Sequence, residues 1–228
     1  MKKNLTEIKK NVITACRVLS HEDLVRGFGH VSARIPESDR FVLTPRVSLA
    51  LVREKDLLIL NLKGEVVEGK STPPFETALH TAIYKGRSDI NAAARIHGRR
   101  AGYFSVTGRR IEPVHNHGSF FYGGVPVFPK TDLISTQRLG EEVVEAMERS
   151  PAILLRGNGQ VTIGRTIPEA VMMAIYLEEA ADMLYGALQV GTPTIFSSDE
   201  SSLRKVESLP PVDLERAWNF YKKKIAQR

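Results

Sequence analysis

Apolar residues recur every three or four positions in several segments of the chain, and this spacing predicts helices. In the first of them, Leu5, Ile8 and Val12 share one face. Another opens just after Pro73-Pro74, because proline suits the first turn of a helix. The predicted helices cover residues 5–19, a segment that opens near Phe75, 136–147, 168–188 and 212–226.

Short runs of β-branched and aliphatic residues lie between these segments and predict strands. They cover residues 30–34, 41–44, 57–62, 65–68, 91–96, 152–155 and 161–163, with a further strand-like stretch at 114–127. Helices and strands are mixed rather than strictly alternating. This order favours an α/β (α+β) fold with a central, mostly antiparallel sheet flanked by helices.

The chain shows no linker before residue 190, so we expect one domain over residues 1–190. Residues 191–228 then form a C-terminal extension, which is polar and irregular to residue 211 and ends in the short helix. The single cysteine, Cys16, excludes a disulfide framework and a zinc site built from several thiolates.

Composition narrows the partners that we expect. No run of 18 apolar residues occurs, so a membrane span is not expected, and the N-terminus lacks a signal-peptide core, which favours the cytoplasm. The net charge is +6, but basic residues are not clustered or interleaved with aromatic ones. We therefore expect no nucleic-acid surface, and the charge either suits a small anionic substrate or has no functional meaning.

Glu76 is the first candidate for chemistry, because it lies at the predicted start of a helix with His80 one turn later on the same face. The helix dipole favours a carboxylate there, so a charged helix start and a general acid/base are both open. His80 is more typical of a buried, supporting histidine. His97 follows an apolar strand, a place where a rigid scaffold presents functional side chains.

His115 and His117 form an H-x-H pattern within the strand-like stretch. On a strand both side chains would point to one face, where two imidazoles can chelate a divalent cation. The alternative is a polar face with only one buried histidine. Arg46 and Arg99 offer paired donors that match a carboxylate, and each could equally be a solvated surface cation.

Six short motifs then occur in one order along the chain. They are Gly27-Phe28-Gly29-His30-Val31-Ser32-Ala33-Arg34, Leu43-Thr44-Pro45, Pro74-Phe75-Glu76 with His80, Ile96-His97, Gly123-Gly124-Val125-Pro126 and Leu154-Leu155-Arg156-Gly157-Asn158-Gly159. In this order they resemble the class II aldolase/adducin family over about residues 5–190, and more closely its decarboxylase-like branch.

The resemblance implies a class II aldolase-like sheet flanked by helices, assembled as a homotetramer with sites between neighbouring subunits. It also implies a divalent metal, commonly zinc, that three histidines bind, and a glutamate that transfers protons. On this resemblance Glu76 is the glutamate and His97 is the first histidine. Arg99 and Asn158 then stand where relatives place the other two histidines.

Arginine has no lone pair for a metal and keeps its positive charge, so Arg99 would repel the ion. Two alternatives stay open. Either His97, His115 and His117 hold zinc, iron or manganese in a rebuilt site, or no metal takes part and Arg99 stabilises an anionic intermediate. The second alternative needs fewer coincidences, because a guanidinium can replace the charge of the metal.

The turns around the predicted site favour a carboxylated, planar substrate over a sugar phosphate. Prolines remove backbone donors from a phosphate cradle, while Arg46 lies beside an apolar wall that includes Phe75. We expect the substrate to contact a set of six residues. These are His30, Arg46, Phe75, His115, Asn158 and Tyr221.

The function that these residues favour is a lyase for an oxo- or hydroxy-acid. Decarboxylation or carbon–carbon cleavage would pass through a carbanion or enolate. The catalytic residues would be Glu76, His97, Arg99 and His117. Two alternatives remain: an oxidative or isomerising enzyme that uses iron, manganese or zinc, and a non-catalytic binding module like adducin.

Overall fold

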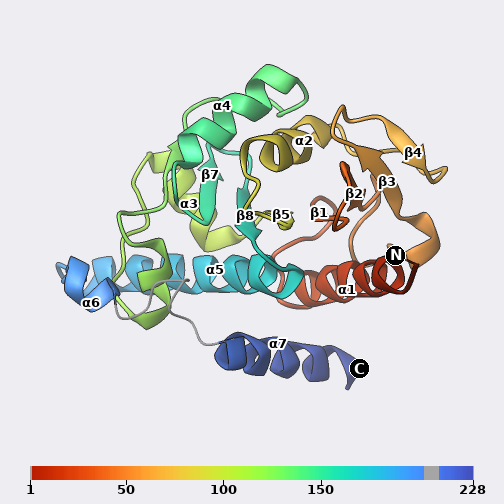
Figure 1. Ribbon diagram of the computed structural model, residues 1–228. Coiled ribbons are helices and arrows are strands. Elements are labelled where there is room, and N and C mark those ends of the chain that lie inside the picture. Colours follow the sequence, from red (N-terminus) through yellow and green to blue (C-terminus); the bar gives the residue numbers. More distant parts are fainter. Residues whose placement is uncertain (1, 203–210, 228) are drawn as a thin grey trace.

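The computed structural model describes residues 2–202 and 211–227 (Figure 1). Its helices are α1 (Lys2–His21), α2 (Thr77–Gly86), α3 (Arg99–Thr107), α4 (Gln137–Met147), α5 (Ile167–Val190), α6 (Ser198–Ser202) and α7 (Pro211–Ala226), with 3₁₀ helices η1 (Glu54–Asp56) and η2 (Asn116–Phe121). The strands are β1 (His30–Arg34), β2 (Arg40–Leu43), β3 (Leu58–Asn61), β4 (Val66–Glu68), β5 (Ala92–Ile96), β6 (Val127–Phe128), β7 (Ala152–Leu155) and β8 (Gln160–Gly164).

These strands form one sheet in the order β4-β3-β2-β1-β5-β8-β7-β6. Every pairing is antiparallel except that of β6 with β7, so the expected mostly antiparallel sheet is confirmed. β5 lies at the centre, between β1 and β8. His30 of β1 is directly opposite Arg95 of β5, and directly opposite residues point to the same face.

Helices cover both faces of the sheet (Figure 1). α2 and α4 pack on one face, where Leu79 and Val143 join the buried cluster. α1, α3 and α5 pack on the other face, and α7 lies outside α1 and α5 with Trp218 buried. Among the described helices, none has the length and apolar character needed to cross a bilayer.

α3 was not predicted, because its sequence opens with two arginines and a glycine that disfavour a helix start. A tertiary contact supplies the missing cap. The Glu178 carboxylate, from α5, accepts hydrogen bonds from the backbone N–H groups of Arg100 at 2.6 Å and Ala101 at 3.0 Å.

The strand-like prediction for residues 114–127 was wrong over most of its length. The segment forms η2, and only Val127–Phe128 pairs with the sheet. Aromatic side chains of η2 pack onto α5 instead, with Phe120 stacked on Tyr176 at 5.4 Å between ring centroids. The segment predicted to be polar and irregular, residues 191–211, contains the short helix α6. Its residues 203–210 lie outside the described residues.

Candidate active site

Glu76 is the N-cap residue of α2, but its carboxylate does not cap that helix. The side chain is buried, and Oε2 lies 3.2 Å from Nε of Arg95. Oε1 accepts hydrogen bonds from the backbone N–H of Ile134 at 3.1 Å and from Nδ2 of Asn158 at 3.4 Å. The carboxylate is therefore fixed from three sides, which is not what a solvated helix start would show.

Arg95, on β5, provides the positive charge beside this carboxylate, and its side chain is 1% exposed. Nη1 donates to the backbone oxygen of Ile96 at 2.8 Å, and Nη2 donates to the backbone oxygen of Asn158. Nε faces Glu76 without a well-aligned hydrogen bond. Burial lowers the pKa of Arg95 and the charge of Glu76 opposes that shift, but a guanidinium stays protonated in either case.

The loop between β7 and β8 packs closely against Arg95. Gly159 has a φ of +77°, and a Cβ at this position would overlap the backbone oxygen of Ile96 and the guanidinium of Arg95. A glycine is therefore required for the close approach. The loop in turn presents both the backbone oxygen and the carboxamide of Asn158 to the site.

His97 lies at the rim of this group, two residues after Arg95. Its Nε2 is 3.5 Å from Nη1 of Arg95, and its ring meets the exposed Phe28 at 6.5 Å between centroids. Partial burial and then the charge of Arg95 lower the pKa of His97 to about 4. Its imidazole is therefore neutral at pH 7.

A chain of hydrogen bonds leads from His30, next to the carboxylate, into the core. Nε2 of His30 lies 3.7 Å from Oε2 of Glu76, and Nδ1 of His30 lies 2.9 Å from Nε2 of His80. Nδ1 of His80 is 2.6 Å from Oγ of Ser32, which is 2.7 Å from Oη of Tyr84. Ser32 and His80 are fully buried, and the exposed fractions of Tyr84, Glu76 and His30 are 2%, 6% and 8%.

One set of proton positions satisfies the whole chain. If Tyr84 donates to Ser32 and Ser32 donates to Nδ1 of His80, then Nε2–H of His80 must donate to His30. The remaining proton of His30 is then on Nε2 and faces Glu76. Burial, first of all, lowers the pKa of His80 to about 3 and that of His30 well below 6.5, so both rings are neutral as this assignment requires.

Arg99 does not take the position predicted for it. It is exposed at the start of α3, where its Nε donates to Oη of Tyr103 at 2.9 Å. The strand ends at Ile96, so the turn into α3 directs the next arginine outward, and Arg95 is the cation against Glu76. We missed Arg95 because it was counted as part of an apolar strand. The signal was its two-residue spacing from His97, since alternate strand residues share a face.

Arg46 and Phe75 lie together next to the site. The guanidinium of Arg46 stacks over the ring of Phe75 at 4.3 Å from its centroid, and both side chains are exposed. Phe75 directly precedes Glu76 in the chain, which places the pair at the start of α2. The predicted combination of a cation and an apolar wall is therefore present as a physical contact.

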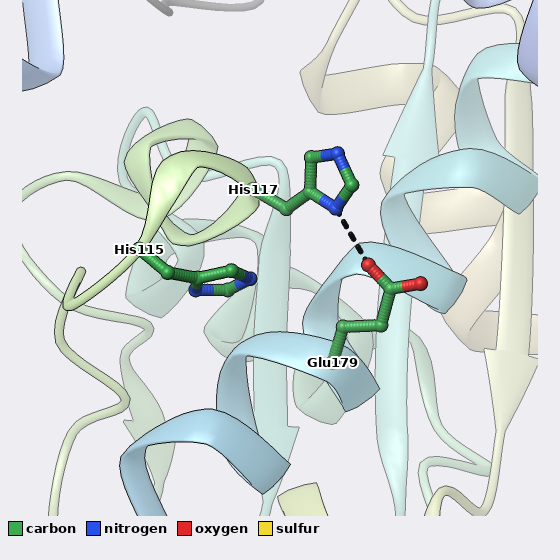
Figure 2. A group of neighbouring side chains, drawn as sticks. All are labelled: His115, His117 and Glu179. Carbon is green, nitrogen blue, oxygen red and sulfur yellow. Dashed lines mark hydrogen bonds and ion pairs between the residues drawn. The ribbon is translucent and has the colours of Figure 1, made fainter. Parts of the chain in front are cut away.

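His115 and His117 form a separate group with Glu179 of α5 (Figure 2). The two residues belong to the start of η2 rather than to a strand, so the strand-based reason for their shared face was wrong. Even so, their ring centroids are 5.8 Å apart. His97 is not a member of this group, so the predicted ligand set of His97, His115 and His117 is not assembled among the described residues.

Tyr221 of α7 lies close to this second group. Burial and then the charge of Glu179 raise the pKa of Tyr221 to about 12. Seven of the predicted site residues thus fall into two sets. Glu76, His97, His30 and Asn158 surround Arg95, whereas His115, His117 and Tyr221 surround Glu179.

The sequence is similar to those of known proteins. Residues 10–185 match the family model for the class II aldolase and adducin N-terminal domain. A 3,4-dihydroxyphthalate decarboxylase from Arthrobacter keyseri is 32% identical over 191 residues, which cover 77% of this chain and 76% of that protein. An L-fuculose phosphate aldolase from Methanocaldococcus jannaschii is 32% identical over 179 residues, which cover 77% of this chain and 94% of the relative.

Solved structures agree on the fold. An L-fuculose 1-phosphate aldolase superposes with a TM-score of 0.82 at 24% identity, covering 88% of this chain and 95% of that chain. An aldolase II superfamily protein from Pseudomonas syringae gives 0.84 at 18% identity, with 97% and 92% covered. Decarboxylases and aldolases are both carbon–carbon lyases, so the predicted enzyme class is confirmed. The chain is a member of the class II aldolase/adducin family.

Proposed function

We propose that the protein is a decarboxylase of a small, planar, hydroxylated carboxylic acid, and that Arg95 replaces the family's metal as the positive charge of the site. The observation that carries this proposal is the buried pair of Arg95 and Glu76, 3.2 Å apart. An arginine still replaces the positive charge of the metal, as predicted from the sequence, but this arginine is Arg95 and not Arg99.

The donors around Glu76 do not fit a divalent metal. Arg95 has no lone pair and adds a fixed positive charge at the carboxylate oxygen that a metal would need. Asn158 faces Oε1 of Glu76, and because a carboxylate only accepts, the amide nitrogen must be on that side. His30 keeps its Nε2 proton toward Glu76 in the assignment above, so it offers no lone pair there. Among the described residues around the carboxylate, Glu76 and His97 remain as ligands, one fewer than the protein supplies at a typical catalytic zinc site.

The geometry supports a sequence of proton transfers on a hydroxylated acid. Glu76 takes the proton of the substrate hydroxyl group and delivers it to the carbon that carries the carboxylate, which gives the keto form of the substrate. The bond between that carbon and the carboxylate then breaks, carbon dioxide leaves, and the electron pair flows into the new carbonyl group to form an enolate. Water finally protonates the oxygen. Arg95 stabilises the negative charge from a buried position, where a fixed charge is most effective.

The neighbours of the site favour an aromatic acid as substrate. Arg46 on the ring of Phe75 presents a cation beside an apolar surface, and Phe28 adds a second exposed ring near His97. A planar carboxylate matches both features. The relatives named 3,4-dihydroxyphthalate decarboxylase act on an acid of this chemical class. We also propose that the chain assembles as a homotetramer.

Aldol cleavage of a sugar phosphate is the second candidate, because the archaeal fuculose phosphate aldolases are equally similar in sequence. Pro73 and Pro74 disfavour it, since they remove two backbone donors from the turn before Glu76. Cleavage of fuculose phosphate without release of carbon dioxide would favour this candidate over the first.

The test is release of carbon dioxide from a panel of hydroxylated benzoates and phthalates by the purified full chain. We expect Glu76→Gln to lower the rate at least about 100-fold, because the variant cannot move the proton. Glu145→Gln, which changes an exposed glutamate of α4, is the matched control and should keep the full rate. Equal rates for Glu76→Gln and the control would remove Glu76 from the mechanism.

A further inference from the structure

A group of three metal-ligand side chains lies apart from Glu76, and the mechanism does not use it. His115, His117 and Glu179 each offer one ligand atom, and these atoms all lie within 4.8 Å of one another (Figure 2). Two imidazole nitrogens and a carboxylate oxygen suit zinc and its neighbours among the divalent transition metals. We propose that His115, His117 and Glu179 bind one divalent transition-metal ion of the zinc class, at a site distinct from that of Glu76.

Two contacts fix the orientation of the His117 ring. Its ring stacks on Tyr176, with centroids 4.2 Å apart and planes at 28°. Its Nδ1 lies 2.6 Å from Oε2 of Glu179. Two ligands of one tetrahedral zinc ion, each about 2.0–2.1 Å from it, are roughly 3.4 Å apart. The ion can therefore replace the shared proton after an opening of this contact by about 1 Å or less.

His115 would bind through Nε2, the ring nitrogen on the side of His117 and Glu179 (Figure 2). Its Nδ1 lies on the other side of the ring, where it is buried and has no hydrogen-bond partner among the described residues. A turn of the ring toward an ion therefore breaks no hydrogen bond of Nδ1.

The two groups share no residue. Glu76 and His97 are not among the described residues whose ligand atoms lie within 4.8 Å of those of His115, His117 and Glu179. An ion at the second site would instead join η2 to α5. Three protein ligands leave a fourth position of a tetrahedral ion for water.

The experiment titrates zinc ions into metal-free full chain without substrate, by calorimetry, and follows a cobalt(II) titration by its visible absorption. We expect about one equivalent to bind and the melting temperature to rise with zinc concentration. His117→Ala and Glu179→Gln should each weaken binding at least 10-fold and abolish the rise. His21→Gln is the matched control, because His21 pairs with Glu22 at 2.9 Å without a third ligand in the described chain.

Three results would overturn the proposal. They are no binding by the wild type, equal affinity in His117→Ala and Glu179→Gln, and loss of binding in His97→Ala or Glu76→Gln instead. Both cluster variants change partly exposed side chains, so unchanged circular dichroism without zinc shows that they fold. Because no activity is measured, the outcome is independent of whether the chain is a decarboxylase.

Discussion

At the scale of single residues, the proposed chemistry depends on which cation touches Glu76. Arg95 is enclosed by β5 and by the loop that carries Asn158, and its charge is compensated by one carboxylate. Such a pair is costly to break, because removal of one partner leaves the other charge buried and unpaired. The residue therefore serves both the stability of the protein and its proposed chemistry.

Arg95→Met should lower the free energy of unfolding by about 3–5 kcal/mol, because Glu76 loses its buried partner. The rate of carbon dioxide release should fall at least about 100-fold through loss of the charge that stabilises the enolate. Arg95→Lys keeps the charge and serves as the control for folding, with a smaller loss of both quantities. Urea unfolding and the decarboxylation assay measure them. A fully active Arg95→Met would contradict the assigned role.

The buried histidines give the protein a pH-dependent stability. His30 and His80 have lowered pKa values in the folded state, whereas an unfolded histidine titrates near 6.5. Their contribution is present above pH 6.5 and is lost as pH falls towards the folded values. Between pH 7 and pH 5, His80 should remove about 2 kcal/mol from the free energy of unfolding, since only the unfolded state takes up the proton. His30 acts in the same direction.

Urea unfolding at the two pH values measures this effect, and His80→Gln isolates it from the carboxylates. The variant should lose about 2 kcal/mol less than the wild type on going from pH 7 to pH 5. An identical pH dependence in both proteins would show that His80 titrates in the folded state.

At the scale of the elements, tertiary contacts decide what the local sequence leaves open. The helices over α1, α4 and α5 carry regular apolar spacing and were predicted close to their observed bounds. α3 was missed because Glu178, which caps it, lies on a helix far along the chain. η2 was mistaken for a strand because aromatic residues favour both a strand and a packed irregular segment.

Glu178→Ala should destabilise the protein by about 2 kcal/mol, because two backbone N–H groups of α3 lose a charged acceptor. Asp182→Asn is the matched control on the same helix, since it removes only the solvent-exposed pair with Arg100. That change should cost about 1 kcal/mol or less. Urea unfolding compares the two, and an equal cost would show that Glu178 does not cap α3.

At the scale of the whole molecule, the antiparallel register brings distant motifs together. β1 places His30 opposite Arg95, and β8 follows the loop that presents Asn158. The family resemblance predicted Glu76, His97 and Asn158 as neighbours, but not that Arg95 would fill the space between them. Residue spacing could not reveal this, because the side chain of Arg95 is positioned by three separate segments.

The measurement that tests the central claim most directly is carbon dioxide release by protein that has been stripped of metal by a chelator and verified by elemental analysis. We expect the stripped wild type and the stripped His117→Ala variant to keep their rate of carbon dioxide release, whereas Arg95→Met loses it. Loss of activity on stripping that zinc restores in both the wild type and His117→Ala would contradict this expectation. That result would place a catalytic ion at Glu76, where we propose that Arg95 provides the positive charge.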